Sequence, residues 1–320
     1  MRLKVAVTGS SGFIGSSLCR SLISRGYLVR RLTSRSNSKT NSLLPNDLKT
    51  FLTDDVRTYL SEALRGVDCV IHCAGLSSVS ARYSNPLEKY RAGNVEYSRI
   101  IAQEAIRMNV KRFVYLSTIK VNGESTSSQA CFTNQSAMNP QSPYAKSKLE
   151  AEEVIKSIAE QGGMEYVIVR PPLVYGPLLS GNLIKLLGLV YMGIPLPFKS
   201  VINSRSMVSL DNLIDLLILS MTSHRVCGET LLVSDGYDLS TPDLLLAISL
   251  YMKKRQILFS VSPKKLQFLG KLIGKERELE KLTGSLRVDI SHTNEVANWS
   301  PPLSIGQGLK QMVDWYMSTK

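Results

Sequence analysis

The sequence is poor in the residue types that bind transition metals. It has three histidines and five cysteines among 320 residues, and it has no C-x-x-C pair. The histidines, His72, His224 and His292, are not spaced as in a zinc site, so we expect no metal. The cysteine number is odd and no secretory leader precedes the first expected strand, which favours reduced thiols and a cytoplasmic location.

The chain also lacks an apolar run long enough to cross a membrane. The longest candidate, 183–195, is short and is interrupted by Lys185, Gly188 and Gly193. We therefore expect no insertion into a membrane.

Acidic residues are fewer than basic ones, 26 against 39, which gives a net charge of +13. The basic residues are spread along the chain, with no zinc-finger spacing and no basic-aromatic RNA motif. This pattern favours a solvated basic surface, and an anionic small ligand such as a diphosphate over a nucleic acid.

Short apolar runs alternate with helical patterns along the first 170 residues. The run at 67–74 (VDCVIHCA) is apolar on both faces, as a strand of a parallel sheet is. Gly26 is expected to end the first helix. The other expected strands lie at 3–8, 27–33, 50–53, 111–118, 166–170 and 231–235, and the expected helices at 13–25, 58–65, 94–109 and 144–161.

This alternation predicts an α/β protein with a Rossmann-type doubly wound parallel sheet and a smaller C-terminal substrate-binding lobe. We expect the dinucleotide-binding core in residues 1–170. Residues 171–320 are expected to form mainly the substrate lobe, with about 207–236 returning to the core. Within that lobe, Thr241 is expected to be the N-cap of a helix.

A glycine-rich motif, TGSSGFIG, follows the first expected strand and opens the first helix. Gly9 permits a tight turn, Gly12 lets the backbone approach a pyrophosphate, and Gly15 lets the helix pack on the strand. The pyrophosphate then binds the free N–H groups of the helix N-terminus. The expected cofactor contacts of this turn are Gly9, Ser11, Gly12, Phe13, Ile14 and Gly15.

The end of the second expected strand lacks the acidic residue that usually binds the ribose of NAD. It carries Thr33, Ser34 and Arg35. Hydroxyl groups and a guanidinium would hold a 2′-phosphate that an acid would repel, so we expect NADP(H) to be favoured, with NAD(H) possible. Asp55 and Val56 fall where such folds contact adenine.

Tyr144 and Lys148 form a Tyr-x-x-x-Lys pair at the start of a strong helical pattern. The i, i+4 spacing puts both side chains on one face of the helix. A nearby ammonium favours the phenolate, so we expect Lys148 to lower the pKa of Tyr144 and make it an acid/base. Lys148 is also expected to hold the nicotinamide ribose.

Ser117 and Thr118 follow the fifth expected strand. Ligands of open α/β sheets bind at the carboxyl ends of the strands, so a hydroxyl there can bind the reacting sugar oxygen beside Tyr144.

Taken together, these motifs resemble the extended short-chain dehydrogenase family, and within it UDP-glucose 4-epimerase and its relatives. The resemblance covers about the first 180 residues in the expected order and continues more weakly to the C-terminus. The matching stretches are TGSSGFIG, VIHCAG, PLEKYRAGNV, VKRFVYLSTIKVNG, PQSPYAKSKLEAE, RPPLVYGP, GNLIKLL, SRSMVSLDNLIDLL and VANWSPP.

The resemblance implies roles for individual residues. Tyr144, Lys148 and Thr118 would be the catalytic triad, and Asn182 and Arg205 would bind the diphosphate of a UDP-sugar. It also implies a homodimer paired through the helices at about 94–109 and 144–161. The other implied cofactor contacts are Cys73, Ala74, Gly75, Asn94, Ser117 and Pro171.

Departures from the epimerases narrow the expected reaction. Thr33 replaces their acid, Ser77 stands where they tend to have Lys, and Pro171 lies in a Pro-Pro-Leu stretch where they have Asn. STIKVNGE and VSDGYDLSTPDLL resemble a branch active in bacterial surface-polysaccharide (O-antigen and capsule) synthesis. That branch includes NADPH-dependent 4-reductases of UDP-4-keto-6-deoxy-N-acetylhexosamines, which is the reaction we expect.

Three alternatives remain from the sequence. A UDP-hexose 4-epimerase would use the same residues and retain its cofactor. A 4,6-dehydratase is disfavoured because Ile119 and Lys120 stand where those enzymes usually carry an acid. A non-catalytic nucleotide-binding sensor would keep the fold and lose the chemistry, and the intact Tyr144 and Lys148 argue against it.

Overall fold

The computed structural model describes residues 2–32, 54–77, 85–127, 129–179, 181–272 and 274–320. A six-stranded sheet with the order β2-β1-β3-β4-β5-β8 forms its centre, and every pairing in it is parallel. This is the doubly wound α/β fold that the alternating sequence pattern predicts. The six strands are β1 (Lys4–Thr8), β2 (Leu28–Leu32), β3 (Cys69–His72), β4 (Arg112–Leu116), β5 (Glu165–Arg170) and β8 (Thr230–Leu232).

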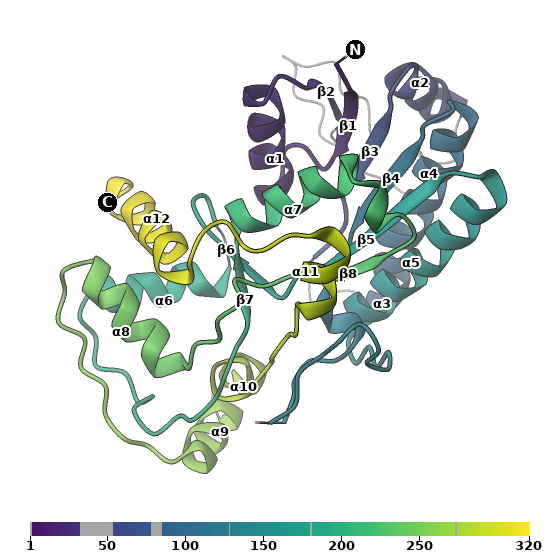
Figure 1. Ribbon diagram of the computed structural model, residues 1–320. Coiled ribbons are helices and arrows are strands. Elements are labelled where there is room, and N and C mark those ends of the chain that lie inside the picture. The colour runs from purple at the N-terminus through teal and green to yellow at the C-terminus, as the bar shows by residue number, and fades with distance from the viewer. Residues whose placement is uncertain (1, 33–53, 78–84, 128, 180, 273) are drawn as a thin grey trace.

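Helices cover both faces of this sheet (Figure 1). The helices α1 (Phe13–Ser24) and α7 (Leu210–Thr222) pack their apolar side chains on one face. The helices α2 (Asp54–Leu64), α4 (Tyr97–Arg107) and α5 (Pro143–Gly162) pack on the other. The strands are buried on both faces, which explains their nearly continuous apolar sequences.

The helix before β4 begins earlier than the expected residue 94 and is not a regular α-helix. It starts as α3 (Pro86–Tyr90), where the Asn85 side chain accepts a hydrogen bond from Glu88 N. It then passes through a π-helical turn, η2 (Arg91–Glu96), into α4. Such π-turns are frequent at functional sites, and periodicity in the sequence does not reveal them.

The C-terminal lobe contains a small parallel sheet and several helices. Its strands, β6 (Leu173–Tyr175) and β7 (Met207–Ser209), were not expected. Two 3₁₀ turns, η3 (Ile119–Val121) and η4 (His224–Val226), lie in loops of the core. The remaining helices are α6 (Asn182–Tyr191), α8 (Thr241–Tyr251), α9 (Pro263–Leu272), α10 (Glu276–Thr283), α11 (Ser291–Ala297) and α12 (Ile305–Ser318).

Two local expectations need correction, one is confirmed, and one falls outside the described part. α2 begins at Asp54 rather than at 58. The N-cap of α8 is Ser240, whose side chain accepts from Asp243 N at 3.1 Å, and Thr241 is already helical. Gly26 follows the C-cap Arg25 with φ of +84°, as expected of a helix-ending glycine. The strand expected at 50–53 lies outside the described residues.

Candidate active site

Four parallel strands of the large sheet end at the same edge and in register. Thr8 at the end of β1 pairs with His72 of β3, and His72 pairs with Tyr115 of β4. Leu116, the last residue of β4, pairs with Val169 of β5. The loops that follow these strands carry most of the site residues expected from the sequence, so those residues lie at one edge of the sheet.

The glycine turn has the geometry of a phosphate cradle. Gly9 has φ of +66°, and a Cβ there would lie 2.8 Å from the backbone of Ala74. A Cβ at Gly15 would lie 2.2 Å from Gly9 O, so both positions require glycine. Gly12 is the N-cap of α1 and supplies no side-chain cap, which leaves the N-terminal N–H groups of the helix for an anion. These residues fit the diphosphate of a dinucleotide.

Arg31 of β2 also reaches this turn, although no sequence motif singles it out. Its Nη2 donates to Ser10 O at 3.3 Å.

The expected cofactor residues Thr33, Ser34 and Arg35 lie outside the described residues. Asp55 and Val56 lie in the first turn of α2, and nothing is described of their side chains.

Tyr144 lies in the first turn of α5. That helix begins at the N-cap Ser142, whose side chain accepts from Ala145 N at 3.3 Å, with Pro143 at its first position. The Tyr144 and Tyr90 rings lie 5.8 Å apart between centroids. The Thr118 side chain interacts with the Tyr144 phenol and lowers its pKa. The acid/base candidate and its hydroxyl partner are therefore neighbours.

Burial is the main cause of the shifted pKa values of Tyr144 and Lys148. It raises the pKa of Tyr144 to about 12, although the hydrogen bond with Thr118 lowers it. The expected lowering of this pKa is wrong in direction, because the loss of water around the phenol outweighs the favourable contact. Burial also lowers the pKa of Lys148 to about 7, against the attraction of Glu152.

Lys148 is held in place by two contacts with β4. Its Nζ donates to Leu116 O at 2.7 Å and lies 4.0 Å from the centroid of the Tyr115 ring. Both contacts are made at the strand end that precedes Ser117. Lys148 is therefore fixed one helical turn behind Tyr144, as the i, i+4 spacing predicted.

A buried ion pair lies one further turn along α5. Glu152 Oε2 accepts from Arg170 Nη2 at 2.5 Å, and Oε1 accepts from Arg170 Nε at 2.9 Å. The Ser117 hydroxyl donates to the same carboxylate, and Arg170 Nη1 donates to Asn122 Oδ1 at 3.1 Å. Ser117 thus points into this network, which also includes Asn122, four residues after Thr118.

A chain of hydrogen bonds through His72 joins the end of β1, the loop after β3 and the helix α4. Thr8 Oγ1 and Ser98 Oγ lie 2.6 Å and 2.8 Å from the two ring nitrogens of His72. Ser98 donates to Asn94 O at 2.5 Å and Ala74 N donates to Thr8 Oγ1 at 3.2 Å. This assigns the proton to Nε2, because Ser98 has already donated its own. Burial lowers the pKa of His72 to about 3.

Asn94, in the π-helical turn, fixes the loop after β3. Its Oδ1 accepts from Leu76 N at 2.6 Å, and its Nδ2 donates to Leu76 O at 3.1 Å and to Ser147 Oγ at 2.9 Å. The half-buried Cys73 precedes this loop and the exposed Ser77 ends its described part. A Cβ at Gly75 would lie 3.0 Å from Asn94 Oδ1. Asn94 therefore shapes the loop.

The expected substrate residues of the lobe are farther along the chain. Asn182 is exposed at the start of α6. Arg205 Nη1 donates to Gly284 O at 2.9 Å, and burial lowers the pKa of its guanidinium while Glu124 raises it. Pro171 O accepts from Ile119 N at 3.0 Å, next to Thr118.

Glu124 was not expected from the sequence and lies between these groups. Its carboxylate accepts from Ser142 Oγ at 2.9 Å and pairs with Lys120 Nζ at 2.8 Å. It acts electrostatically on both Tyr144 and Arg205. A motif search cannot find such a residue, because its partners come from three separate segments.

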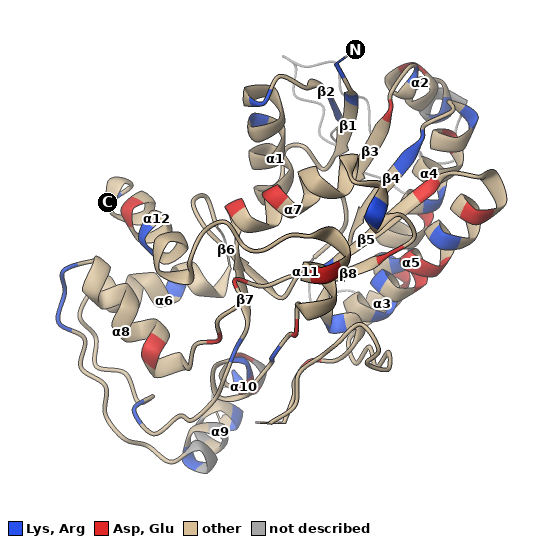
Figure 2. Cartoon of the chain, viewed as in Figure 1, with Lys and Arg blue, Asp and Glu red and all other residues tan. Residues whose placement is uncertain are grey.

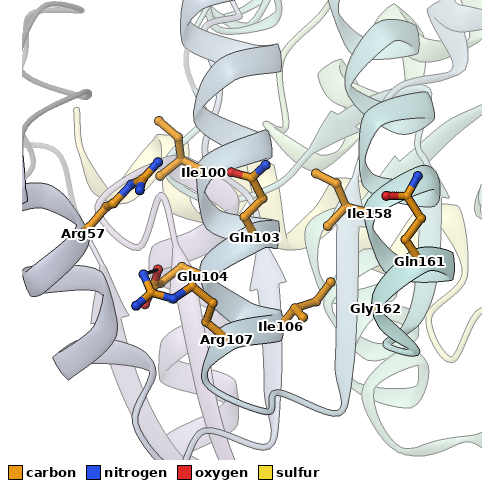
Figure 3. A pocket seen from close by; sticks show the side chains of 9 residues that line it. All are labelled: Arg57, Ile100, Gln103, Glu104, Ile106, Arg107, Ile158, Gln161 and Gly162. Carbon is orange, nitrogen blue, oxygen red and sulfur yellow. Dashed lines mark hydrogen bonds and ion pairs between the residues drawn. The ribbon is translucent and has the colours of Figure 1, made fainter.

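A surface pocket of about 350 Å³ lies elsewhere, between α2, α4 and α5 (Figure 3). Ile158, Gln161 and Gly162 line it at the C-terminal end of α5, and Tyr144 lies at the N-terminal end of this 20-residue helix. A helix of this length spans roughly 30 Å, so the pocket is remote from Tyr144. Among the described residues, no group of three or more His, Cys, Asp or Glu could hold a metal.

Comparison with known proteins gives the family. The model of the NAD dependent epimerase/dehydratase family matches residues 5–226. A Vibrio cholerae protein described as UDP-glucose 4-epimerase is 36% identical over 322 residues, covering 99% of this chain and 96% of the relative.

Solved structures share the fold. UDP-glucuronic acid 4-epimerase from Bacillus cereus, in complex with NAD, has a TM-score of 0.77 at 20% identity and covers 99% of both chains. UDP-N-acetylglucosamine 4-epimerase from Methanobrevibacter ruminantium also has a TM-score of 0.77, at 23% identity over the full length of both chains. The chain has the short-chain dehydrogenase fold and belongs to the NAD dependent epimerase/dehydratase family of enzymes.

Proposed function

We propose that this protein is an oxidoreductase acting at C4 of a UDP-linked sugar, with a nicotinamide dinucleotide as cofactor. The observation that carries the proposal is the pairing of Tyr144 with Thr118, beside the buried Lys148 and at the same edge of the sheet as the uncapped N-terminus of α1. An acid/base, a hydroxyl donor and an anion cradle at one edge of a parallel sheet are what hydride transfer to a bound sugar ketone requires.

In this proposal the nicotinamide, when bound, supplies and accepts the hydride. Tyr144 holds the proton at its phenolic oxygen, since burial keeps the phenol neutral, and gives it to the C4 oxygen as negative charge develops there. Thr118 orients the same oxygen. In the opposite direction Tyr144 takes the proton back, and Lys148 stabilises the phenolate.

The net reaction that the relatives favour is 4-epimerisation. The full-length relative from Vibrio cholerae is described as a UDP-glucose 4-epimerase, and the solved structures with this fold include 4-epimerases. An epimerase would oxidise C4 and reduce it again from the other face, so it would need no second substrate. The description of the family and its NAD complexes favour NAD(H) for such a cycle.

A second candidate is the 4-keto reduction of a UDP-4-keto-6-deoxy-N-acetylhexosamine in surface-polysaccharide synthesis. One observation favours it: Thr33-Ser34-Arg35 replaces the acid expected for NAD, which suits NADPH and therefore net reduction. Tyr144 and Thr118 would perform the same proton transfer, in one direction only.

The remaining contacts in the proposal follow from position and charge. Arg205 would supply the guanidinium for the diphosphate, together with Asn182 at the start of α6, and Ser77 would approach the sugar. Gly75 and Asn94 would shape the loop beside the nicotinamide.

The test separates the two reactions. Purified protein is mixed with UDP-hexose isomers without added cofactor, and separately with a UDP-4-keto-6-deoxy-N-acetylhexosamine and either NADPH or NADH. Interconversion of the isomers with no net change in nicotinamide absorbance supports the epimerase. Stoichiometric loss of NADPH, with NADH slower, supports the reductase. Neither outcome would refute the proposed chemistry at C4.

We also propose a cytoplasmic homodimer paired through α4 and α5. The free state of all five cysteines supports the location. Ile100 of α4 and Ile158 of α5 are partly exposed along the pocket in Figure 3. Ile158→Glu is expected to turn a dimer into a monomer by light scattering. A monomeric wild-type protein would refute this pairing.

A further inference from the structure

The stretch 244–275 of the C-terminal lobe contains seven Lys and Arg residues and no Asp or Glu. The whole chain has 39 basic and 26 acidic residues, so about five acidic residues would accompany seven basic ones at the average ratio. The stretch includes α9 and the segment that leads to it from α8. Figure 1 shows that this segment follows the outer margin of the lobe.

The α9 helix has one face inside the lobe and the opposite face outside. Leu266 is buried, and a Cβ on Gly270 would lie 2.6 Å from Leu279 of α10. Phe268 follows Leu266 by two residues and Leu272 follows Gly270 by two residues. Each step of two residues turns about 200° around the helix. They are 64% and 67% exposed. They therefore form an apolar stripe that faces away from the protein.

Lysines flank this stripe. Lys265 and Lys271 are exposed on α9, and Lys275 is exposed just after it. The spacing 265, 268 and 272 keeps these residues on one side of the helix. Acidic residues resume at Glu276 in α10, which packs against the opposite face of α9. Lysine stems can lie along an apolar surface while the ammonium groups reach outward.

The segment before α9 repeats the pattern. Leu196 N donates to Ile257 O at 2.9 Å, and Phe259 N donates to Leu196 O at 3.0 Å, so this segment runs as an edge beside residues 196–199. Leu258 packs into the lobe, and the alternating Ile257 and Phe259 are 49% and 45% exposed. The basic run 253–255 precedes them, and Figure 2 shows the basic residues along this margin.

We propose that this margin, residues 253–275, docks on the surface of an anionic lipid bilayer. Phe268 and Leu272 would enter the headgroup boundary, and the flanking lysines would bind the lipid phosphates. The match is one of charge and shape: a convex apolar stripe between cations fits the interface plane of a bilayer, whereas a protein partner would need a groove to receive it. This is attachment to a surface, since no helix among the described residues is long and apolar enough to span a membrane.

The docking surface is separate from the proposed active site. In Figure 1, α9 lies at the end of the molecule opposite α1 and α2. The proposal therefore does not depend on the reaction at C4, and its test uses no activity measurement.

The test is co-sedimentation of the full-length protein with vesicles. One set is phosphatidylcholine alone, and the other contains about a third phosphatidylglycerol, at low and at high salt. We expect sedimentation with the anionic set, weakened by salt. Phe268→Ser combined with Leu272→Ser should reduce the bound fraction about tenfold or more.

Two matched variants control for folding and for charge. Ile23→Ser changes an apolar side chain that is 57% exposed on α1, and it should bind as the wild type does. Lys265→Gln with Lys271→Gln should lose the preference for anionic vesicles, whereas Lys310→Gln with Lys111→Gln should keep it. Thermal melts check that each variant is folded.

Three results would overturn the proposal. The first is no sedimentation of the wild type with anionic vesicles, and the second is equal binding by Phe268→Ser/Leu272→Ser. The third is self-association of the wild type in ultracentrifugation that this double variant abolishes, which would make the stripe a contact between copies of the chain.

Discussion

Behind the edge of the large sheet where Leu116 and Val169 lie, the interior contains Lys148, Glu152 and Arg170, whereas the hydrophobic core of the C-terminal lobe is built from Leu, Ile, Val, Met, Phe and Tyr side chains. Among the described residues, every buried Asp, Glu, Lys or Arg except Asp235 precedes residue 171. Asp235 lies at the junction, where it accepts from Tyr175 Oη at 2.6 Å and from Asn212 Nδ2 at 2.7 Å.

The two interiors differ because the core has to position particular groups, whereas the lobe has to be filled by well-packed side chains. Hydrogen bonds and ion pairs set distances and directions, and in the core they hold Ser117, Lys148 and the loop after β3 in place. Apolar packing sets volume, and it tolerates repacking more readily. We therefore expect changes in the core to affect geometry and stability together, and changes inside the lobe to affect mainly stability.

The largest effect is expected at Tyr144. Tyr144→Phe removes the acid/base and leaves the ring packed against Tyr90, so turnover should fall about 10²–10⁴-fold. Cofactor binding by fluorescence titration should be nearly unchanged. A variant that turns over at the wild-type rate would exclude the proposed proton transfer.

The next largest effect is expected on stability, when the buried ion pair is broken. Arg170→Met leaves the Glu152 carboxylate buried without its partner, and the free energy of unfolding should drop by about 3–5 kcal/mol. Denaturant unfolding measures this loss. The double variant with Glu152→Gln should recover much of it, and a double variant less stable than the single one would contradict the pairing.

In the apolar lobe, Leu187→Ala is expected to lower the free energy of unfolding by about 2–5 kcal/mol, because Leu187 is fully buried. It should leave cofactor affinity unchanged, whereas we expect Arg170→Met to lower the affinity, because Glu152 would no longer be fixed beside Ser117. Equal losses of affinity in both variants would remove the contrast between the two regions.

His72 should make stability depend on pH. Burial holds its pKa at about 3 in the folded protein, below the ordinary value of 6.5, so the unfolded chain binds more protons between these values. The stabilising contribution is present above about pH 6.5 and is lost as pH falls, by up to about 1.4 kcal/mol per pH unit. His72→Gln should flatten this part of the unfolding profile, and an unchanged slope would refute the assignment.

The smallest effect is expected at an exposed pair. Lys310 and Asp314 lie four residues apart on α12, with side chains 60% and 57% exposed. Lys310→Ala should change the free energy of unfolding by about 0.5 kcal/mol or less. A loss of stability as large as that of Arg170→Met would show that burial does not determine how much an ion pair stabilises this protein.

The sequence was sufficient wherever the determining contacts are local. Strand-turn-helix periodicity with three glycines predicted the parallel sheet and the cradle at α1, and the spacing of Tyr144 and Lys148 predicted their shared helix face. Gly9 and Gly15 were predictable because the backbone itself requires them.

Tertiary structure decided what depends on distant partners. Glu152 meets Arg170 and Ser117, and Glu124 meets Ser142, only after separate segments fold together. The β6–β7 pair and the π-helical turn at Asn94 have no local signal either. Protonation belongs to the same class: the Tyr144 phenol has a raised pKa because burial removes its water, and no spacing in a sequence measures burial.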